Sequence, residues 1–253
     1  IDDLDTPRVR PGADRAILRA LEELGLWWNG EVQYQSPWRD HYQEAYERLR
    51  RDGRLFPCGC TRRELAGGPY PGTCRDGLPA GRIGRSWRFR LPEGPITIDD
   101  RIHGPRELDL ADACGDFVVL RADGVHAYHL ATVIDDARMG VTQVVRGADL
   151  LMASACQGLL QEALGLSRPD YAHLPLAVTP DGTKLSKREQ SPAIDPGQPA
   201  QVLRLALDFL GHAPPQELDA APASLLLEWA LEHWELRRVP AVPSRPAPGQ
   251  AGP

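Results

Sequence analysis

Two lysines lie three positions apart in residues 182–191, which read GTKLSKREQS. They are Lys184 and Lys187, and they are the only lysines of the chain, whose other 27 basic residues (29 minus 2) are arginines. A lysine ammonium is a compact charge on a flexible stem and can follow a moving phosphate, whereas arginine favours a fixed bidentate partner. The pair therefore indicates polyphosphate binding by a Gly-containing loop, with ordinary surface lysines on a solvated turn as the alternative.

Three of the five cysteines are crowded into one segment rich in glycine and proline. They are Cys58, Cys60 and Cys74. Thiolates at this density suit tetrahedral Zn²⁺, and a structural zinc site needs a fourth ligand. No histidine lies in the segment, so Tyr70, Asp76 or water must complete the set. We favour zinc over small buried hydrophobes because this segment offers little apolar core.

Other candidate binding residues lie near predicted strand ends. Asp2, Asp3 and Asp5 could hold Mg²⁺ or an ammonium group at the carboxyl end of a strand, although Asp5 is equally a candidate helix cap. Arg146 follows an apolar strand, which places its guanidinium at a strand end for a carboxylate or phosphate; an exposed surface arginine is the alternative. Tyr128 fits a core aromatic residue with a polar tip.

The composition is that of a folded globular protein, with 42% hydrophobic and 25% charged residues among 253. No apolar run approaches the roughly 18 to 20 residues that span a bilayer, so we expect a cytoplasmic protein without membrane contact. The odd cysteine count argues against a disulfide framework, and Cys114 and Cys156 are expected in the core. Because the net charge is −6, nucleic acid must meet a local basic patch. The stretch GRIGRSWRFR, with arginines at 82, 85, 88 and 90, is one such patch.

Alternating helix and strand patterns predict an α/β fold that begins in mid-fold, with residues 1–5 as the end of a strand. The predicted helices are residues 13–24, 37–53 with Ser36 as the cap, about 150 onward, 201–210 and 223–234. The predicted strands are residues 32–35, 86–91, 116–121, an apolar run from about 127, 141–145 and a strand before the Pro-Asp-Gly turn at 180–182. Residues 237–253 are Pro-rich and are expected to form a disordered tail.

Four motifs together resemble one known family. They are DLDTPR, CGCTRREL with YPGTCR, AYHLATVIDDARMGVTQVVRGADLL, and KLSKR. In this order and spacing the motifs resemble the class I glutamyl-tRNA synthetase family, and most closely its short form without an anticodon-binding domain, the glutamyl-queuosine tRNA(Asp) synthetases. The resemblance covers about residues 1 to 210.

The resemblance implies a Rossmann-like nucleotide-binding core that is split by a zinc-bearing insert. The implied units are residues 1–55 (first half of the core), 56–125 (insert), 126–190 (second half, with a KMSKS-like loop), 191–236 (helical region) and 237–253 (tail). It implies a structural Zn²⁺ on Cys58, Cys60, Tyr70 and Cys74. It also implies an ATP loop of Lys184, Leu185, Ser186, Lys187 and Arg188, in which the two lysines are catalytic. Glutamate would be held by Asp2, Tyr128 and Arg146, with Asp2 standing where the family usually has glutamate.

The activity implied is activation of L-glutamate by ATP and Mg²⁺ without tRNA, followed by transfer to the queuosine nucleoside in the anticodon of tRNA(Asp), by a monomer. The family's HIGH-like motif is absent from the sequence, so this polypeptide is expected to be inactive by itself. Two alternatives are a truncated ordinary glutamyl-tRNA synthetase and a non-catalytic zinc module that binds RNA.

Overall fold

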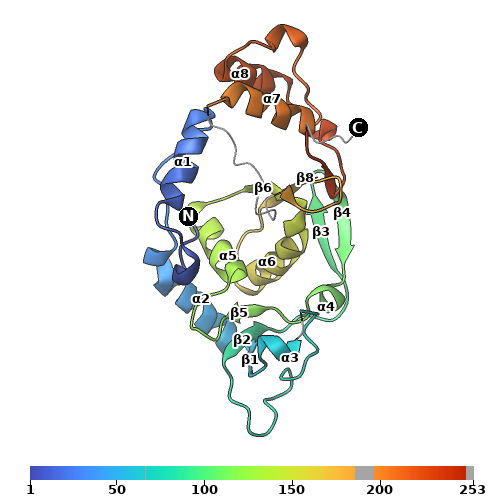
Figure 1. The fold of residues 1–253 in the computed structure, drawn as a ribbon. Helices are drawn as coiled ribbons and strands as arrows, with labels where there is room; N and C mark the ends of the chain where they lie inside the picture. Colours follow the sequence, from blue (N-terminus) through green and yellow to red (C-terminus); the bar gives the residue numbers. More distant parts are fainter. Residues whose placement is uncertain (66, 186–196, 249–253) are drawn as a thin grey trace.

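The computed structural model describes residues 1–65, 67–185 and 197–248. Two helices, α5 and α6, lie at the centre of the molecule in Figure 1, with the β1–β2–α3 module at one end and the helices α7 and α8 at the other. Within the described ranges, none of the helices has both the length and the apolar character needed to cross a membrane.

The regular elements alternate along the chain. The α-helices are α1 (Ala13–Glu23), α2 (Arg39–Arg51), α3 (Arg62–Leu65), α4 (Leu110–Ala113), α5 (Tyr128–Met139), α6 (Leu151–Ala163), α7 (Pro199–Phe209) and α8 (Ala223–His233). The strands are β1 (Leu55–Cys58), β2 (Ser86–Phe89), β3 (Ile96–Asp100), β4 (Gly104–Leu108), β5 (Val118–Leu120), β6 (Gln143–Gly147), β7 (Asp170–Leu174), β8 (Leu176–Val178) and β9 (Ser244–Pro246).

The strands form three sheets. The largest has the order β4-β3-β7-β6, in which β7 runs parallel to both β3 and β6 and β4 closes an antiparallel hairpin with β3. A second sheet, β1-β2-β5, is antiparallel, and β8 pairs with β9 in parallel. Residues 56–125, predicted as one insert, therefore contribute strands to two sheets, because the β3–β4 hairpin adds to the sheet of β6 and β7.

The main hydrophobic core joins the two larger sheets through the helices between them. Its buried side chains come from α2, α5 and α6 and from β1, β2 and β5, and include Leu49, Leu130, Leu160, Phe89 and Val119. Each of these five side chains is at most 2% exposed. Apolar burial of this kind is the main driving force for folding, so it fixes α5 and α6 against the sheets and sets where their first residues lie.

The apolar run from residue 127 forms the helix α5, so the predicted strand there is wrong. Its buried residues Leu130, Ala131 and Val133 recur at helical spacing, and Gly140, at φ 66°, ends the helix in the left-handed conformation that glycine adopts easily. The run is apolar on most sides because α5 packs against both α2 and α6. Periodicity cannot separate such a buried helix from a buried strand.

Three predictions at the N-terminal end are also wrong. Residues 1–5 and 32–35 are not strands; Ile1 makes only two backbone hydrogen bonds with the other segment, at Gln33 and Gln35, too few for a ladder. Ser36 does not cap α2, because its N–H and its hydroxyl both donate to the carboxylate of Asp3, at 2.7 and 2.6 Å. This contact between residues 33 positions apart thus fixes where residues 1–5 lie relative to the segment that precedes α2.

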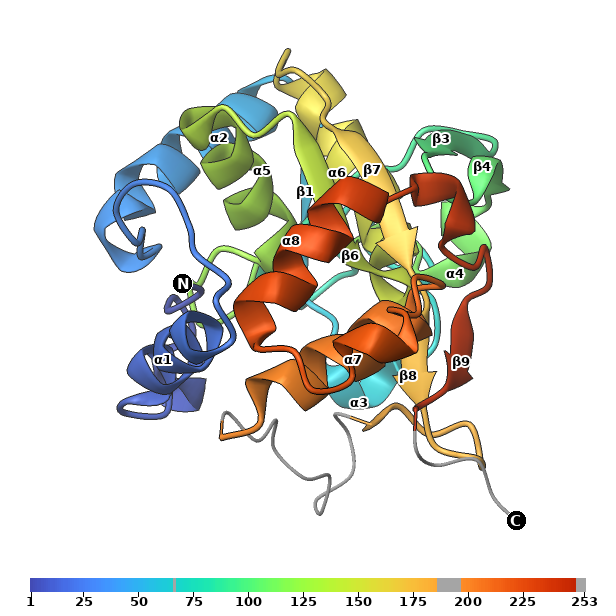
Figure 2. The ribbon, with the colours of Figure 1, turned by 90° about the horizontal axis from the view of Figure 1, so that it is seen from above.

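The C-terminal region returns to the body of the molecule, and Figure 2 shows α8 beside α7 and β9 beside β8. Leu24 at the end of α1 packs with Leu203 of α7 and Leu226 of α8. Residues 237–248, predicted as disordered tail, are ordered: β9 pairs with β8, and Val239 and Ala247 are buried. Proline is tolerated in β9 because it is an edge strand. The predicted helices near 201–210 and 223–234 are confirmed.

Candidate functional site

The three cysteines predicted to bind a metal come together at one end of the molecule. The Sγ atoms of Cys58, Cys60 and Cys74 all lie within 4.8 Å of one another, and those of Cys60 and Cys74 are 3.8 Å apart. Tetrahedral Zn²⁺ with bonds of about 2.3 Å to sulfur places neighbouring sulfur atoms about 3.8 Å apart. The donor set therefore fits a zinc ion.

Tyr70 lies beside this cluster. Its hydroxyl lies 3.7 Å from the Sγ atom of Cys58 and accepts a hydrogen bond of 2.7 Å from the N–H of Cys74. The backbone of Tyr70 passes so close to Gly115 that a Cβ there would lie 2.5 Å from the Tyr70 carbonyl oxygen, and Gly115 has a φ of 65°. By contrast the side chain of Asp76 is 95% exposed. Of the candidate fourth ligands, Tyr70 is placed at the cluster.

The thiols of the cluster differ in acidity. Burial raises the pKa of Cys58, but hydrogen bonds from the Cys60 N–H, Arg88 and Tyr70 outweigh burial and bring the pKa down to about 7. For Cys60, burial and the contacts with the other two thiols raise the pKa to about 11. Crowded thiolates repel one another, and a bound cation relieves that repulsion.

Arg146 and Tyr128, both predicted from the sequence, lie against each other, but Tyr128 is exposed and is not the core aromatic residue that the sequence predicted. Arg146 is near the carboxyl end of β6, and Tyr128 is the first residue of α5. The Nη1 atom of Arg146 donates to the Tyr128 hydroxyl at 3.4 Å, and the Tyr128 side chain is on the surface, with 41% exposure. An arginine edge and a phenol that both face an open region can bind a carboxylate.

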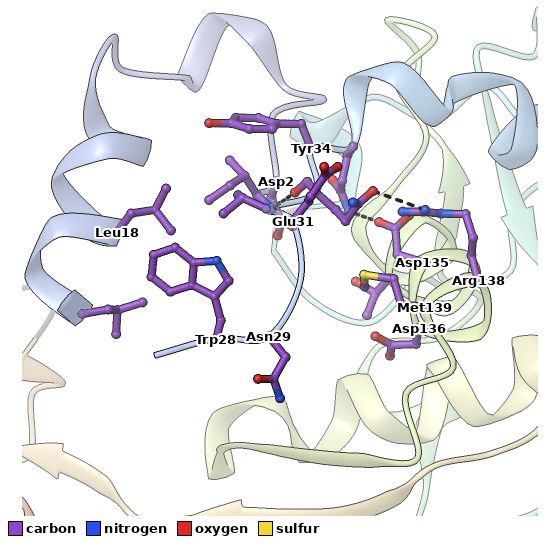
Figure 3. Close-up of a pocket in the computed structure, with 16 residues that line it drawn as sticks. Asp2, Leu18, Trp28, Asn29, Glu31, Tyr34, Asp135, Asp136, Arg138 and Met139 are labelled. Carbon is purple, nitrogen blue, oxygen red and sulfur yellow. Dashed lines mark hydrogen bonds and ion pairs between the residues drawn. The ribbon is translucent and has the colours of Figure 1, made fainter. Parts of the chain in front are cut away.

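Asp2 lies at the junction of two cavities. One, of about 310 Å³, is lined by both Asp2 and Tyr128. The other, of about 400 Å³, lies between α1 and α5, and Figure 3 shows Asp2 there with the α5 residues Asp135 and Asp136. Burial raises the pKa of Asp136, Arg146 opposes this, and Asp135 and Asp2 add to it. Asp2 and Tyr128 therefore border one cavity, and Arg146 adjoins it through its contact with the Tyr128 hydroxyl.

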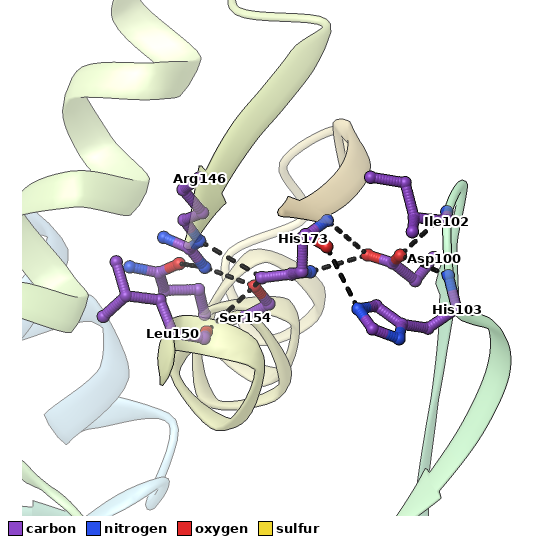
Figure 4. A network of polar contacts seen from close by, with 8 residues as sticks. Asp100, Ile102, His103, Arg146, Leu150, Ser154 and His173 are labelled. Atoms are coloured by element: carbon purple, nitrogen blue, oxygen red, sulfur yellow. Dashed lines mark hydrogen bonds and ion pairs between the residues drawn. The ribbon is translucent and has the colours of Figure 1, made fainter. Parts of the chain in front are cut away.

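Four polar residues that the sequence did not single out lie directly behind Arg146. Its Nη2 atom donates to the Ser154 hydroxyl and, at 2.6 Å, to the Oε1 atom of Gln157, both on α6. Figure 4 shows how Ser154 meets His173 of β7, which in turn meets Asp100 of β3. Asp100, Ser154, Gln157 and His173 are each at most 5% exposed. The sequence signal that could have indicated this network is His173, a histidine within the apolar run YAHLPLAV.

The loop that carries the two lysines begins with a tight hairpin. Residues 179–183 form a turn in which Gly182 has a φ of 81°, and Lys184 bridges back to Val178. The Lys184 ammonium pairs at 2.5 Å with the carboxylate of Asp149, three residues after Arg146. Leu185 is described, whereas the predicted ATP-loop residues Ser186, Lys187 and Arg188 lie outside the described residues. The first lysine is thus tied to the β6–α6 connection.

An arginine-lined cleft separates the cysteine module from Tyr128. It has a volume of about 610 Å³, and its lining includes Arg62, Arg85, Arg88 and Arg121 together with Phe117 and His129. Within the basic stretch 82–90 the other arginines make internal contacts: Arg82 pairs with Glu64, and Arg90 donates to the carbonyl oxygen of Arg75. Arg88 is buried and donates to the Asp116 carbonyl oxygen. Most of this stretch therefore serves the fold, and Arg85 is exposed to solvent.

The chain matches a protein-family model described as tRNA synthetases class I (E and Q), catalytic domain, over residues 1–68 and 83–207. The matched residues include Asp2, Tyr128 and Arg146 and the lysine loop, whereas Tyr70 and Cys74 fall in the gap between the two matched ranges.

Curated relatives and solved structures agree with that match. A glutamyl-Q tRNA(Asp) synthetase of Chromobacterium violaceum is 50% identical over 96% of this chain and 84% of its own length. One of Aromatoleum aromaticum is 49% identical over 98% of this chain and 81% of its own length. The crystal structure of glutamate-tRNA synthetase from Elizabethkingia anophelis superposes with a TM-score of 0.76 at 25% identity, covering 99% of this chain and 61% of that one.

The fold, the match to the catalytic-domain model and the identity of about half of all residues over nearly the whole chain lead to one assignment. The chain belongs to the glutamyl-Q tRNA(Asp) synthetase family of class I tRNA synthetases.

Proposed function

We propose that the protein activates L-glutamate with ATP and transfers it to the queuosine nucleoside in the anticodon of tRNA(Asp). One observation carries the proposal: the Arg146–Tyr128 pair and the anchor of the lysine loop meet on the same β6–α6 connection, since Lys184 pairs with Asp149. A carboxylate bound at Arg146 therefore lies next to a loop suited to polyphosphate. That juxtaposition is what amino-acid activation requires.

In the first step a carboxylate oxygen of glutamate attacks the α-phosphorus of ATP, the bond to the β-phosphate breaks, and pyrophosphate leaves. Arg146 and Tyr128 would hold a carboxylate of glutamate, and Asp2 its ammonium group. The loop residues Lys184, Leu185, Ser186, Lys187 and Arg188 would hold ATP with its Mg²⁺. The two lysines would act by stabilising charge that builds up on the phosphates.

In the second step a hydroxyl of the queuosine nucleoside attacks the activated carbonyl carbon, and AMP leaves. The arginine-lined cleft supports this assignment, because its volume of about 610 Å³ suits a nucleoside and it opens beside Tyr128. His129 offers part of a ring surface, and the exposed Arg62 and Arg85 offer charge for the phosphates on either side. This is how bases splayed out of an anticodon loop are commonly read.

Glutamate should support exchange of pyrophosphate into ATP by the full-length protein in the absence of any tRNA. The reason is that all the groups assigned to the first step belong to the protein. The measurement is incorporation of labelled pyrophosphate into ATP with glutamate, with glutamine and without amino acid. Exchange that does not depend on glutamate, or that glutamine supports equally, would contradict the proposed function.

We include one structural zinc ion in the proposal, held by the cysteine cluster and Tyr70. The purified protein should contain about one zinc per chain, and Cys58→Ser should release it, because loss of one thiolate opens the tetrahedral set. The matched control is Cys114→Ser, which removes a thiol that packs at the edge of the main core instead. Elemental analysis of unchelated protein checks this. Equal zinc contents in the two variants would favour the interpretation of the cysteines as small buried hydrophobes.

A further inference from the structure

The guanidinium of Arg146 is divided between two environments. Its inner nitrogen, Nη2, has two buried acceptors, the Ser154 hydroxyl and the Gln157 side-chain oxygen. Its outer nitrogen, Nη1, faces the exposed Tyr128 hydroxyl. Because the hydrogen bonds of Nη2 hold the planar guanidinium in place, Nη1 of Arg146 points in one fixed direction, toward Tyr128.

The contacts behind Ser154 fix which atom donates and which accepts. Asp100 accepts from the backbone N–H groups of Ile102 and His103, at 2.9 and 2.8 Å, and from Nδ1 of His173 at 2.6 Å. Burial raises the pKa of Asp100, but these hydrogen bonds lower it, so the carboxylate is ionised at neutral pH. A carboxylate only accepts, so Nδ1 of His173 carries the proton.

His173 then presents an acceptor to Ser154. Burial lowers the pKa of His173 by more than Asp100 raises it, and the ring is neutral at neutral pH. Its Nε2 atom therefore has a lone pair, and it lies 2.8 Å from the Ser154 oxygen, which donates its proton there. The oxygen of Ser154 is left to accept from Arg146. These hydrogen bonds run in one direction, from Arg146 through Ser154 and His173 to Asp100; the Nε atom of Arg146 also lies 3.5 Å from Nε2 of His173, and the Ser154 hydroxyl lies 3.3 Å from the Leu150 carbonyl oxygen.

An Asp-His-Ser chain is also the arrangement of a nucleophilic triad, but Ser154 cannot serve as a nucleophile. It is 1% exposed, and Arg146 lies against its oxygen on the side toward the open region. A nucleophile must reach a substrate atom, and this oxygen does not.

We propose that Asp100, His173 and Ser154 are positioning residues that orient Arg146 toward the carboxylate of glutamate. The inference rests on the proposed function, since it concerns the same site. His173 and Arg146 are direct partners in the β6–β7 register, and Asp100 reaches them from β3. The hairpin β3–β4 thus extends the sheet and also supplies the residue that sets the tautomer of His173. A preorganised guanidinium binds a carboxylate with less loss of side-chain freedom.

The first test is the tautomer itself. In ¹⁵N NMR spectra of the full-length protein, one neutral histidine should have Nδ1 protonated and Nε2 unprotonated, and that signal should be absent from His173→Asn. Asn retains a donor at the position of Nδ1 toward Asp100, but its side chain is too short to place an acceptor where Nε2 meets Ser154. A His173 signal with the proton on Nε2 would reverse the direction of the chain and overturn the inference.

The second test separates orientation of Arg146 from general damage. Ser154→Ala and Gln157→Met each remove one buried acceptor of Arg146 and should raise the glutamate KM in pyrophosphate exchange about tenfold, leaving the ATP KM and the kcat nearly unchanged. The matched control is Gln161→Met, one helical turn further along α6, where the side chain is equally buried but contacts Tyr171. It should keep the wild-type glutamate KM.

The relay also predicts non-additivity. Ser154→Ala combined with His173→Asn should raise the glutamate KM about tenfold, as each change does alone, because both break the same chain of hydrogen bonds. A product of the two effects, about a hundredfold, would mean that the residues act separately and would overturn the relay. If the wild-type protein shows normal exchange and both Ser154→Ala and Gln157→Met keep its glutamate KM, only this inference is overturned. If the wild-type protein shows no glutamate-dependent exchange, the proposed function is overturned as well.

Discussion

Glutamate transfer should be lost on tRNA(Asp) that lacks queuosine and should survive removal of the 3′-terminal CCA. The proposed acceptor is a nucleoside of the anticodon loop, so the 3′ end carries no reacting group. We expect transfer to queuosine-free tRNA(Asp) to fall by at least about a hundredfold, because the attacking hydroxyl itself is missing and the cleft loses the contacts made to it.

This prediction assigns the queuosine nucleoside to the arginine-lined cleft. The cleft beside Tyr128 is lined by arginines from the cysteine module and from the segment before α5. The described part of the C-terminal region packs on the rest of the molecule, with α7 and α8 against Leu24 of α1 and β9 paired with β8. We therefore expect recognition to use the core and the cysteine module.

The measurement is attachment of labelled glutamate to four RNAs: tRNA(Asp) with and without queuosine, each with and without the CCA end. Glutamate-dependent pyrophosphate exchange, which is proposed to need no tRNA, serves as the control and should be the same in the presence of each of the four RNAs. Transfer that requires the 3′ end and ignores queuosine would instead place the protein with the ordinary glutamyl-tRNA synthetases in its activity.

Lys187→Ala should lower the rate of glutamyl-adenylate formation about a hundredfold to a thousandfold, with little change in the KM for glutamate. Removal of one preorganised donor to a developing oxyanion has effects of about this size, and the charge is needed mainly in the transition state. The glutamate KM should stay because Arg146 and Tyr128 are untouched.

Two further variants sharpen that experiment. Lys187→Arg keeps the charge but replaces a compact ammonium by a planar fork, so it should recover only part of the rate. Asp149→Asn removes the carboxylate that pairs with Lys184 at 2.5 Å. It should change the KM for ATP without abolishing exchange, since it alters how the loop is anchored and removes no phosphate contact. Wild-type exchange by Lys187→Ala would rule out the role of that lysine.

The residues that carry chemistry were accessible from the sequence because their signals are local. The two lysines are three positions apart, the C-x-C pair is followed by Tyr70 and Cys74 within sixteen residues of Cys58 (74 minus 58), and Arg146 directly follows an apolar strand. In the structure the thiols lie within 4.8 Å of one another, and Arg146 lies against Tyr128. Their roles in binding and catalysis stay predictions.

Several helices could also be predicted from the sequence. Helices α1 and α7 have strong helical periodicity, and α1 ends before Gly25, which has a φ of 74°. Each is amphipathic because one face packs and the other meets water, and that contrast is what a pattern records. The hydrophobic pattern did not identify α5 as a helix. Because α5 packs against both α2 and α6, its sequence shows little contrast between an apolar and a polar face.

Only the tertiary structure decided what supports Arg146. Asp100 and His173 are 73 positions apart, and no local pattern links them. They meet because β3 joins the sheet beside β7, a pairing that depends on the whole fold. The same holds for Asp3, which meets Ser36 from 33 positions away, and for β9, whose Pro-rich sequence resembles a disordered segment until β8 offers it a free edge. Sequence determines which groups are available; long-range pairing, driven by burial and by the need to satisfy buried polar groups, decides which of them meet.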